Sequence, residues 1–181
     1  MTDRLRIALA QLNPTVGALA ANLDLGRRAL ADARDAGADI LLLSELFLTG
    51  YFPEDLLFKP RFVRDAISAA RELAEDTRGT GVSLLLPSVW VEGDRLYNAV
   101  LLCEDGEIVE RRYKYELPND DVFYEKRYFQ PGPLPDPIMI KGVRVGVPIC
   151  EDIWHPPVCA ALVERGAELL LCPNGSPYWR N

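Results

Sequence analysis

The stretch ADILLLSE, residues 38–45, decides the fold class of this chain. Its large aliphatic residues follow one another without a polar break, as in a short strand that is buried on both faces of a sheet. Upstream, residues 18–37 predict a helix, because apolar positions recur at helical spacing and Gly37 is a favourable stop. The run LRIALAQ, residues 5–11, predicts a strand before that helix. Strand, helix and strand together form a βαβ unit.

Two hairpins are predicted further along the chain. LYNAVLLCEDGEIVERRYK contains two strand-like runs joined at Asp105-Gly106, a strong signal for a tight antiparallel turn. PIMIKGVRVGVPIC has the same form and turns at Lys141-Gly142. The chain therefore combines a βαβ unit with antiparallel strand pairs.

The remaining elements complete a mixed architecture. Helical periodicity predicts a second helix over residues 61–77, and apolar runs predict strands over 81–91 and 168–172, with a short helix over 157–166. Residues 116–137 show no periodicity and contain five prolines, so they predict a long irregular loop, a kind of segment that is often functional. The pattern indicates an α/β protein with a mixed sheet and helices on its outer faces.

Composition excludes several classes of protein. The chain has 181 residues, 49% of them hydrophobic, and a net charge of -7 with no basic stripe, so we expect no binding to nucleic acid. No apolar run approaches the roughly 20 residues that span a membrane, and the N-terminus has no signal-peptide pattern. We expect a cytoplasmic protein without disulfide bonds. Because the chain stops just after its last predicted strand, we expect residues 1–181 to be one domain that is incomplete at its C-terminus.

Three reactive side chains share one local context. Glu45, Lys114 and Cys150 each follow the C-terminal end of a predicted strand, where sheets with helices on their faces bind ligands. If their strands are neighbours, we expect Glu45 and Lys114 to lie near the Cys150 sulfur. Lys114 would lower the pKa of the thiol and stabilise an oxyanion, and Glu45 would act as general base and acid.

Simpler interpretations of these residues stay open at this point. Cys150 has the context of a buried structural cysteine, and the acidic residues Glu151 and Asp152 that follow it disfavour a thiolate. A zinc site or a Cys–His dyad would need His155, but the cysteine and histidine spacings fit no standard zinc pattern, so we expect no metal. Glu45 and Lys114 could each be an isolated solvated charge.

Three motifs, in this order, carry a resemblance to a known family: SELFLTGY (44–51), RRYKYELPN (111–119) and PICEDIW (148–154). They resemble the catalytic segments of the carbon–nitrogen hydrolase (nitrilase) superfamily, and the resemblance extends from LRIALAQLNPTVG to NGSP. It implies a nitrilase-like αββα sandwich and a catalytic triad of Glu45, Lys114 and Cys150. Within the superfamily the chain is most similar to the glutaminase domains of glutamine-dependent NAD+ synthetases.

That resemblance implies further roles. Cys150 would attack the side-chain amide of glutamine, and Glu125 would support Lys114. The residues that would line the glutamine site are Tyr51, Phe123, Glu151 and Ser176. One local departure lies at Asp120-Asp121, where many members have Tyr-Gly, and this substitution puts one glutamine contact in doubt.

The resemblance also implies the partners. The glutaminase chemistry would need no cofactor, whereas ATP and Mg²⁺ would serve a synthetase domain that is not in this chain. Homo-oligomers are expected, because nitrilase-type domains generally associate. The alternatives are a stand-alone amidase or carbamoylase, and a truncated, non-catalytic fragment whose unpaired sheet edges promote association.

Overall fold

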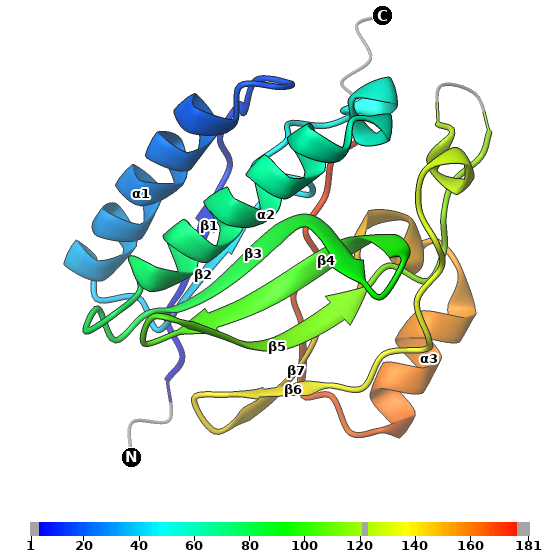
Figure 1. Cartoon of the computed structure of the whole chain (residues 1–181). Coiled ribbons are helices and arrows are strands. Elements are labelled where there is room, and N and C mark those ends of the chain that lie inside the picture. The colour runs from blue at the N-terminus through cyan, green and yellow to red at the C-terminus, as the bar shows by residue number, and fades with distance from the viewer. Residues whose placement is uncertain (1–3, 121–122, 177–181) are drawn as a thin grey trace, which may run out of the picture.

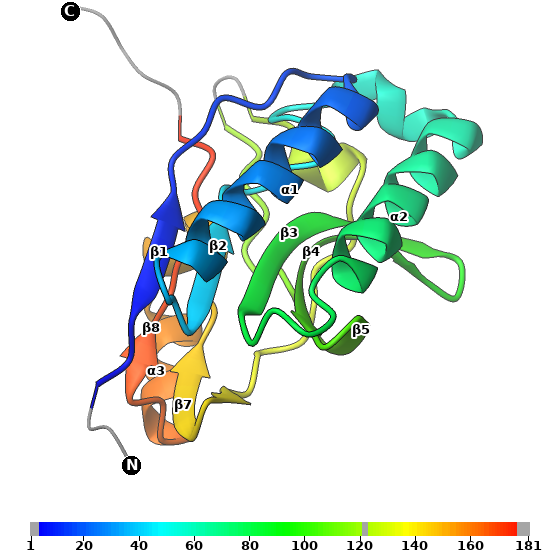
Figure 2. The same ribbon diagram turned by 90° about the vertical axis from the view of Figure 1, so that its left-hand side faces the viewer.

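The computed structural model describes residues 4–120 and 123–176 and has four layers (Figures 1 and 2). Helices α1 (Leu19–Asp35) and α2 (Pro60–Glu75) lie side by side on one face of a five-stranded sheet. A three-stranded sheet packs on the other face, and helix α3 (Pro156–Glu164) lies outside it. The predicted αββα sandwich is confirmed.

The five-stranded sheet is mixed, as predicted, and has the order β1-β2-β3-β4-β5. Strands β1, β2 and β3 are parallel, whereas β4 runs antiparallel to both of its neighbours β3 and β5. The bounds of these strands are Ile7–Ala10, Ile40–Leu43, Ser83–Glu92, Arg95–Glu104 and Glu107–Tyr113. The stretch quoted at the start is thus β2, which is buried along its whole length between β1 and β3.

The second sheet has the order β6-β7-β8, with strands Ile138–Ile140, Val143–Gly146 and Leu169–Leu170. Strands β6 and β7 form the predicted hairpin, and β7 and β8 are parallel. Both predicted turns place two successive residues at positive φ, Asp105 and Gly106 in one, Lys141 and Gly142 in the other. Such φ values match the turns that suit the twist of paired strands.

Alternating side chains divide the interior into two cores. On β4, Ala99, Leu101 and Cys103 face the α1–α2 layer, whereas Val100 and Leu102 face the second sheet. Such alternation is what the two-residue period of a strand gives when both faces of a sheet are covered. Beyond the end of β7, Val147 and Ile149 belong to the core between the two sheets, and Cys150 follows them directly.

The structure contains elements that the sequence did not predict. Strands β3 and β4 also form a long hairpin, with Glu92 opposite Arg95, although the sequence patterns assigned no partner to residues 81–91. Three short 3₁₀ helices, Glu54–Phe58 (η1), Glu125–Arg127 (η2) and Cys150–Ile153 (η3), occur in segments without helical periodicity. None of the helices in the described residues is both long and apolar enough to cross a membrane.

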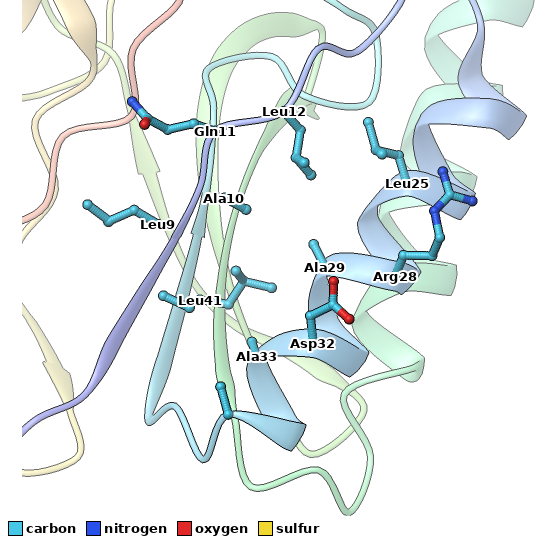
Figure 3. A pocket seen from close by; sticks show the side chains of 12 residues that line it. Leu9, Ala10, Gln11, Leu12, Leu25, Arg28, Ala29, Asp32, Ala33 and Leu41 are labelled. Carbon is cyan, nitrogen blue, oxygen red and sulfur yellow. The ribbon is translucent and has the colours of Figure 1, made fainter.

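A groove of about 580 Å³ runs between α1 and the edge strand β1 (Figure 3). Its walls are mainly small and aliphatic, with Leu12 from the β1 side opposite Leu25 and Ala29 from α1, and with Arg28 and Asp32 as charged members. None of the candidate catalytic residues lines this groove.

The contact between α1 and α2 depends on a glycine. A Cβ atom at Gly26 would lie 2.8 Å from a Leu73 methyl carbon and 3.2 Å from the Phe47 ring. We predict that Gly26→Val destabilises the protein by about 1–3 kcal/mol, because overpacking forces neighbouring side chains and backbone apart. Ala21→Val, at an exposed position of the same helix, is the matched control and should cost only helix propensity. Urea unfolding of both variants measures the difference, and equal midpoints would contradict the prediction.

Candidate active site

Strand direction brings the candidate residues to one edge of the large sheet. Glu45 follows the C-terminal end of β2, and Lys114 follows that of β5, which runs in the same direction. These strands are not neighbours, contrary to our condition for the site, because β3 and β4 lie between them. The long side chain of Lys114 spans the gap, and its ammonium group reaches Glu45 with an Nζ–Oε1 distance of 2.7 Å.

Lys114 lies between two carboxylates in the interior. Its Nζ is also 2.8 Å from Oε1 of Glu125, and all three side chains are fully buried. Burial by itself lowers the pKa of a lysine, but the negative charges of Glu45 and Glu125 outweigh that effect and raise the pKa of Lys114. The group is therefore a fixed cation and hydrogen-bond donor at neutral pH.

Glu125 occupies the start of η2, inside the long proline-rich loop. Burial and the charge of Glu45 raise its pKa to about 7, although Lys114 acts in the opposite direction. The hydroxyl of Tyr51 donates a hydrogen bond to Glu125 Oε1 at 3.2 Å. Burial also raises the pKa of Tyr51, as do the two carboxylates, so this hydroxyl stays protonated and remains a donor.

Asn98, which we did not predict as a site residue, joins the same cluster. Its Nδ2 donates to Glu45 Oε1 at 2.8 Å and lies 3.5 Å from Glu125 Oε2. Its backbone carbonyl accepts the N–H of Lys114 at 2.9 Å. The sequence pattern pointed to residues at the C-terminal ends of strands, whereas Asn98 lies near the N-terminal end of the antiparallel strand β4. The signal that could have found it is one amide residue within the otherwise apolar run YNAVLLC.

Cys150 begins η3 in a left-handed backbone conformation, with φ of 46°. Its N–H donates to the carbonyl of Pro173 at 3.0 Å, which ties the start of η3 to the segment after β8. The residue is 7% exposed, so the sulfur is almost completely enclosed. The extended backbone at Ile149 thus turns sharply into η3 at this cysteine, beyond the end of β7.

Burial has the largest effect on the protonation of this thiol. Burial and the nearby Glu45 carboxylate raise the pKa of Cys150 to about 12, although Lys114 and a backbone N–H of Gly175 lower it. Lys114 thus acts in the expected direction, but desolvation and Glu45 together exceed the effect of the single cation. The resting site holds a neutral thiol beside a buried carboxylate.

The two oxygens of Glu45 have different surroundings. Oε1 accepts hydrogen bonds from both Lys114 and Asn98, whereas Oε2 is buried and accepts none from the described residues. A Cβ atom at Gly175 would lie 2.9 Å from Oε2, so this oxygen faces the residue whose backbone meets the Cys150 sulfur. Glu45 thus has one oxygen held in place and one available to exchange a proton.

Asp152, the second acidic residue after the cysteine, has a structural role. It is 1% exposed, and its carboxylate accepts the N–H groups of Tyr115, Glu116 and Ile149 at 3.1, 2.7 and 2.9 Å. These bonds connect the turn that holds Cys150 to the backbone just after Lys114. Burial raises the pKa of Asp152 to about 6 against the opposing effect of these N–H donors. The side chain braces two catalytic segments and does not simply add charge near the thiol.

The candidate substrate-binding residues, unlike the buried Glu45, Lys114 and Glu125, range from partly buried to exposed. Tyr51 and Phe123 are partly buried, with ring centroids 6.3 Å apart. The Glu151 carboxylate lies 3.0 Å from the His155 imidazole, and Ser176 is exposed with its hydroxyl 3.5 Å from the Asn174 side chain.

The segment that departs from the resemblance is only partly visible. Asp120 is exposed and its carbonyl accepts the N–H of Phe123, whereas Asp121 lies outside the described residues. Across residues 4–120 and 123–176, no three His, Cys, Asp or Glu side chains converge as a metal site would require.

Comparison with known proteins assigns the family. The model of the family described as carbon-nitrogen hydrolase matches residues 6–181, which is nearly the whole chain. The chain belongs to the carbon–nitrogen hydrolase family.

Members of this family with similar sequence are glutamine-dependent NAD(+) synthetases. The one from Rhodobacter capsulatus is 51% identical over 180 residues, which cover 99% of this chain and 32% of that protein. The one from Thermotoga maritima is 42% identical over 97% of this chain and 31% of that protein. The chain thus spans about a third of the length of the curated relatives it matches.

Solved structures of the family agree with the fold. The glutamine-dependent NAD+ synthetase from Acinetobacter baumannii, in complex with adenosine diphosphate, superposes with a TM-score of 0.91 at 31% identity over 97% of this chain and 33% of that one. An amidase from Nesterenkonia sp. superposes with a TM-score of 0.83 at 30% identity over 94% of this chain and 64% of that one.

The brace at Asp152 can be tested directly. We predict that Asp152→Asn destabilises the protein by about 2 kcal/mol or more, because an amide N–H₂ then faces backbone N–H donors that lose a charged acceptor. Asp136→Asn, an exposed partner of Arg165, is the control and should change the free energy of unfolding by less than about 1 kcal/mol. Urea unfolding compares the two, and equal losses would show that Asp152 is not a brace.

Proposed function

We propose that this chain is the glutamine-hydrolysing part of a glutamine-dependent NAD+ synthetase. The observation that carries the proposal is the buried cluster of Glu45, Lys114 and Glu125 beside the enclosed thiol of Cys150. The identity to synthetases supports this branch of the family, as does the near-complete superposition on one of them. Within a longer protein, residues 1–181 would belong to a carbon–nitrogen hydrolase domain.

In the proposed first half-reaction, the neutral Cys150 thiol attacks the side-chain amide carbon of glutamine. Glu45 Oε2 accepts the thiol proton as the carbon–sulfur bond forms, so no free thiolate has to exist in the resting site. The oxyanion of the tetrahedral intermediate receives hydrogen bonds from the Lys114 ammonium and from the backbone N–H of Glu151. Glu45 returns the proton to the amide nitrogen, the carbon–nitrogen bond breaks, and ammonia leaves a glutamyl thioester.

The second half-reaction reverses these roles. Glu45 removes a proton from a water molecule that attacks the thioester carbon. Lys114 again donates a hydrogen bond to the oxyanion of the tetrahedral intermediate. Collapse of this intermediate breaks the carbon–sulfur bond. The proton held by Glu45 returns to the sulfur, which regenerates the neutral thiol and releases glutamate.

Other residues would hold the substrate and the cation. Lys114 and the Tyr51 hydroxyl both donate hydrogen bonds to Oε1 of Glu125, and this shared acceptor would keep the ammonium group in place. We assign Glu151 to the ammonium group of glutamine, and Tyr51, Phe123 and Ser176 to the remaining walls of its site.

The side chains named above suffice for this chemistry. ATP and Mg²⁺ would be needed only by the synthetase part, which uses the ammonia to convert nicotinic acid adenine dinucleotide to NAD+. We further propose a cytoplasmic homo-oligomer. A stand-alone amidase is the second candidate, because the Nesterenkonia amidase shares the fold at a TM-score of 0.83.

The role of the thiol gives the first functional prediction. In the full-length protein, Cys150→Ala should abolish glutamine-dependent NAD+ formation, because the acylation step has no nucleophile. Ammonia-dependent NAD+ formation should persist, because it needs no glutaminase. A glutamine-mimicking chloroketone should label the unmodified protein at Cys150, and mass spectrometry locates the adduct. Glutamine-driven turnover in the variant would overturn the proposal, whereas absence of both activities in the unmodified protein would favour the stand-alone amidase.

The role of Glu45 predicts that its removal slows glutamine hydrolysis but speeds alkylation of Cys150. In Glu45→Gln, glutamine hydrolysis should fall by about 10²–10⁴-fold, because the general base is lost. Iodoacetamide should nevertheless alkylate Cys150 faster at pH 8. The Glu45 charge raises the pKa of the thiol, so its removal lowers that pKa and increases the thiolate fraction, about tenfold for each unit. Glu164→Gln on α3 is the exposed control. Slower alkylation in the Glu45 variant would contradict this account of the thiol.

A further inference from the structure

Asn98 is an uncharged side chain whose amide donates to Glu45 within the buried carboxylate pair. It is fully buried on β4, its side-chain amide meets both Glu45 and Glu125, and its backbone carbonyl holds the N–H of Lys114. A single residue therefore contacts all three charged members of the site. Among the described residues the side-chain amide of Asn98 hydrogen-bonds only to Glu45 and Glu125, so we expect it to influence the reaction through these neighbours.

The contacts made by Asn98 define the orientation of Glu45. Its amide and the Lys114 ammonium bind the same carboxylate oxygen, with donor–acceptor distances of 2.8 and 2.7 Å. With Oε1 occupied by two donors, rotation of the carboxylate would break both hydrogen bonds. Oε2 is consequently kept toward Gly175 and the Cys150 sulfur, without a hydrogen-bond partner among the described residues.

The neutrality of the asparagine matters as much as its donor group. A second cation at this position would bind both carboxylates strongly and lower the proton affinity that a general base and acid needs. An amide donates a hydrogen bond without adding charge, so two carboxylates share one cation. Burial first, and then the charge of Glu45, raise the pKa of Glu125 to about 7, although Lys114 lowers it.

We propose that Asn98 is a positioning residue, which fixes Glu45 so that one carboxylate oxygen rests on Lys114 and the other is presented to the Cys150 thiol. The inference rests on the proposed role of Glu45 as general base. It predicts that Asn98 affects proton transfer more than substrate binding, and that its effect requires an intact Glu45.

The first test separates turnover from binding. In the full-length protein, Asn98→Leu, which has a similar volume and no donor, should lower kcat for glutamine hydrolysis by about 100-fold, the order that a 1 Å misplacement can cost. KM should change by less than about threefold, because uniform substrate binding is retained. Ser88→Ala is the matched control, since Ser88 is equally buried on the adjacent strand β3 and its hydroxyl has no partner among the described residues. The control should keep the wild-type kcat.

The second test does not depend on glutamine being the substrate. Iodoacetamide alkylation of Cys150 is compared in the wild type, Asn98→Leu, Glu45→Gln and the double variant. If Asn98 acts through Glu45, Asn98→Leu should change the alkylation rate by roughly fivefold or more in the presence of Glu45, and by less than about twofold in the Glu45→Gln background. Independent, multiplicative effects in this cycle would overturn the proposal, as would a wild-type kcat in Asn98→Leu.

The outcomes also separate the two proposals. Absence of glutamine hydrolysis in the wild type would reject the proposed function, while the alkylation cycle would still decide the role of Asn98. If Asn98→Leu does not fold, Asn98→Asp keeps the shape of the residue and replaces the donor by a carboxylate. That variant should move the alkylation profile of Cys150 to higher pH by about one unit, because a like charge is added beside Glu45. The same profile as in the wild type would overturn the proposal.

Discussion

The ion pair of Lys114 with two carboxylates is the constraint on which the rest of the site depends. A buried ammonium or carboxylate is costly unless partners satisfy it, and removal of one partner leaves an uncompensated charge. Lys114, Glu45 and Glu125 come from three different segments, so the cluster holds together the end of β2, the end of β5 and the long loop. The ion pair that neutralises Lys114 also fixes the carboxylate of Glu45, the residue that we propose as the general base.

The topology of the large sheet makes this meeting possible. Because β4 runs antiparallel between β3 and β5, the C-terminal ends of β2 and β5 lie at the same edge as the N-terminal part of β4. Asn98 thereby sits between the residues it binds, with its backbone fixed by the β-ladder. A site residue on a strand is held more precisely than one on a loop, which suits the positioning role that we propose for Asn98.

Burial determines the protonation state of the Cys150 thiol. In an enclosed site beside one cation and one carboxylate, this thiol keeps its proton. In the proposed mechanism its activation therefore requires proton transfer to Glu45 during attack. The two acidic residues next to it have separate tasks. Asp152 satisfies backbone N–H groups in the interior, whereas Glu151 remains partly exposed beside His155 and is the residue that we propose for the ammonium group of the substrate. Neighbours in sequence are thus poor guides to the electrostatics of this sulfur.

The sequence by itself determined the elements and the identity of the reactive groups. Hydrophobic periods gave α1, α2 and the buried strand β2, turn residues gave both predicted hairpins, and three motifs gave Glu45, Lys114 and Cys150, because these signals depend on residues close together in the chain. Only the tertiary structure decided the pairing of β3 with β4, the inclusion of Asn98, the bracing role of Asp152 and the protonated state of the thiol. Each of these features depends on which groups meet across the sheet and on how far water is excluded from them. The spacing of residues along the chain predicts neither.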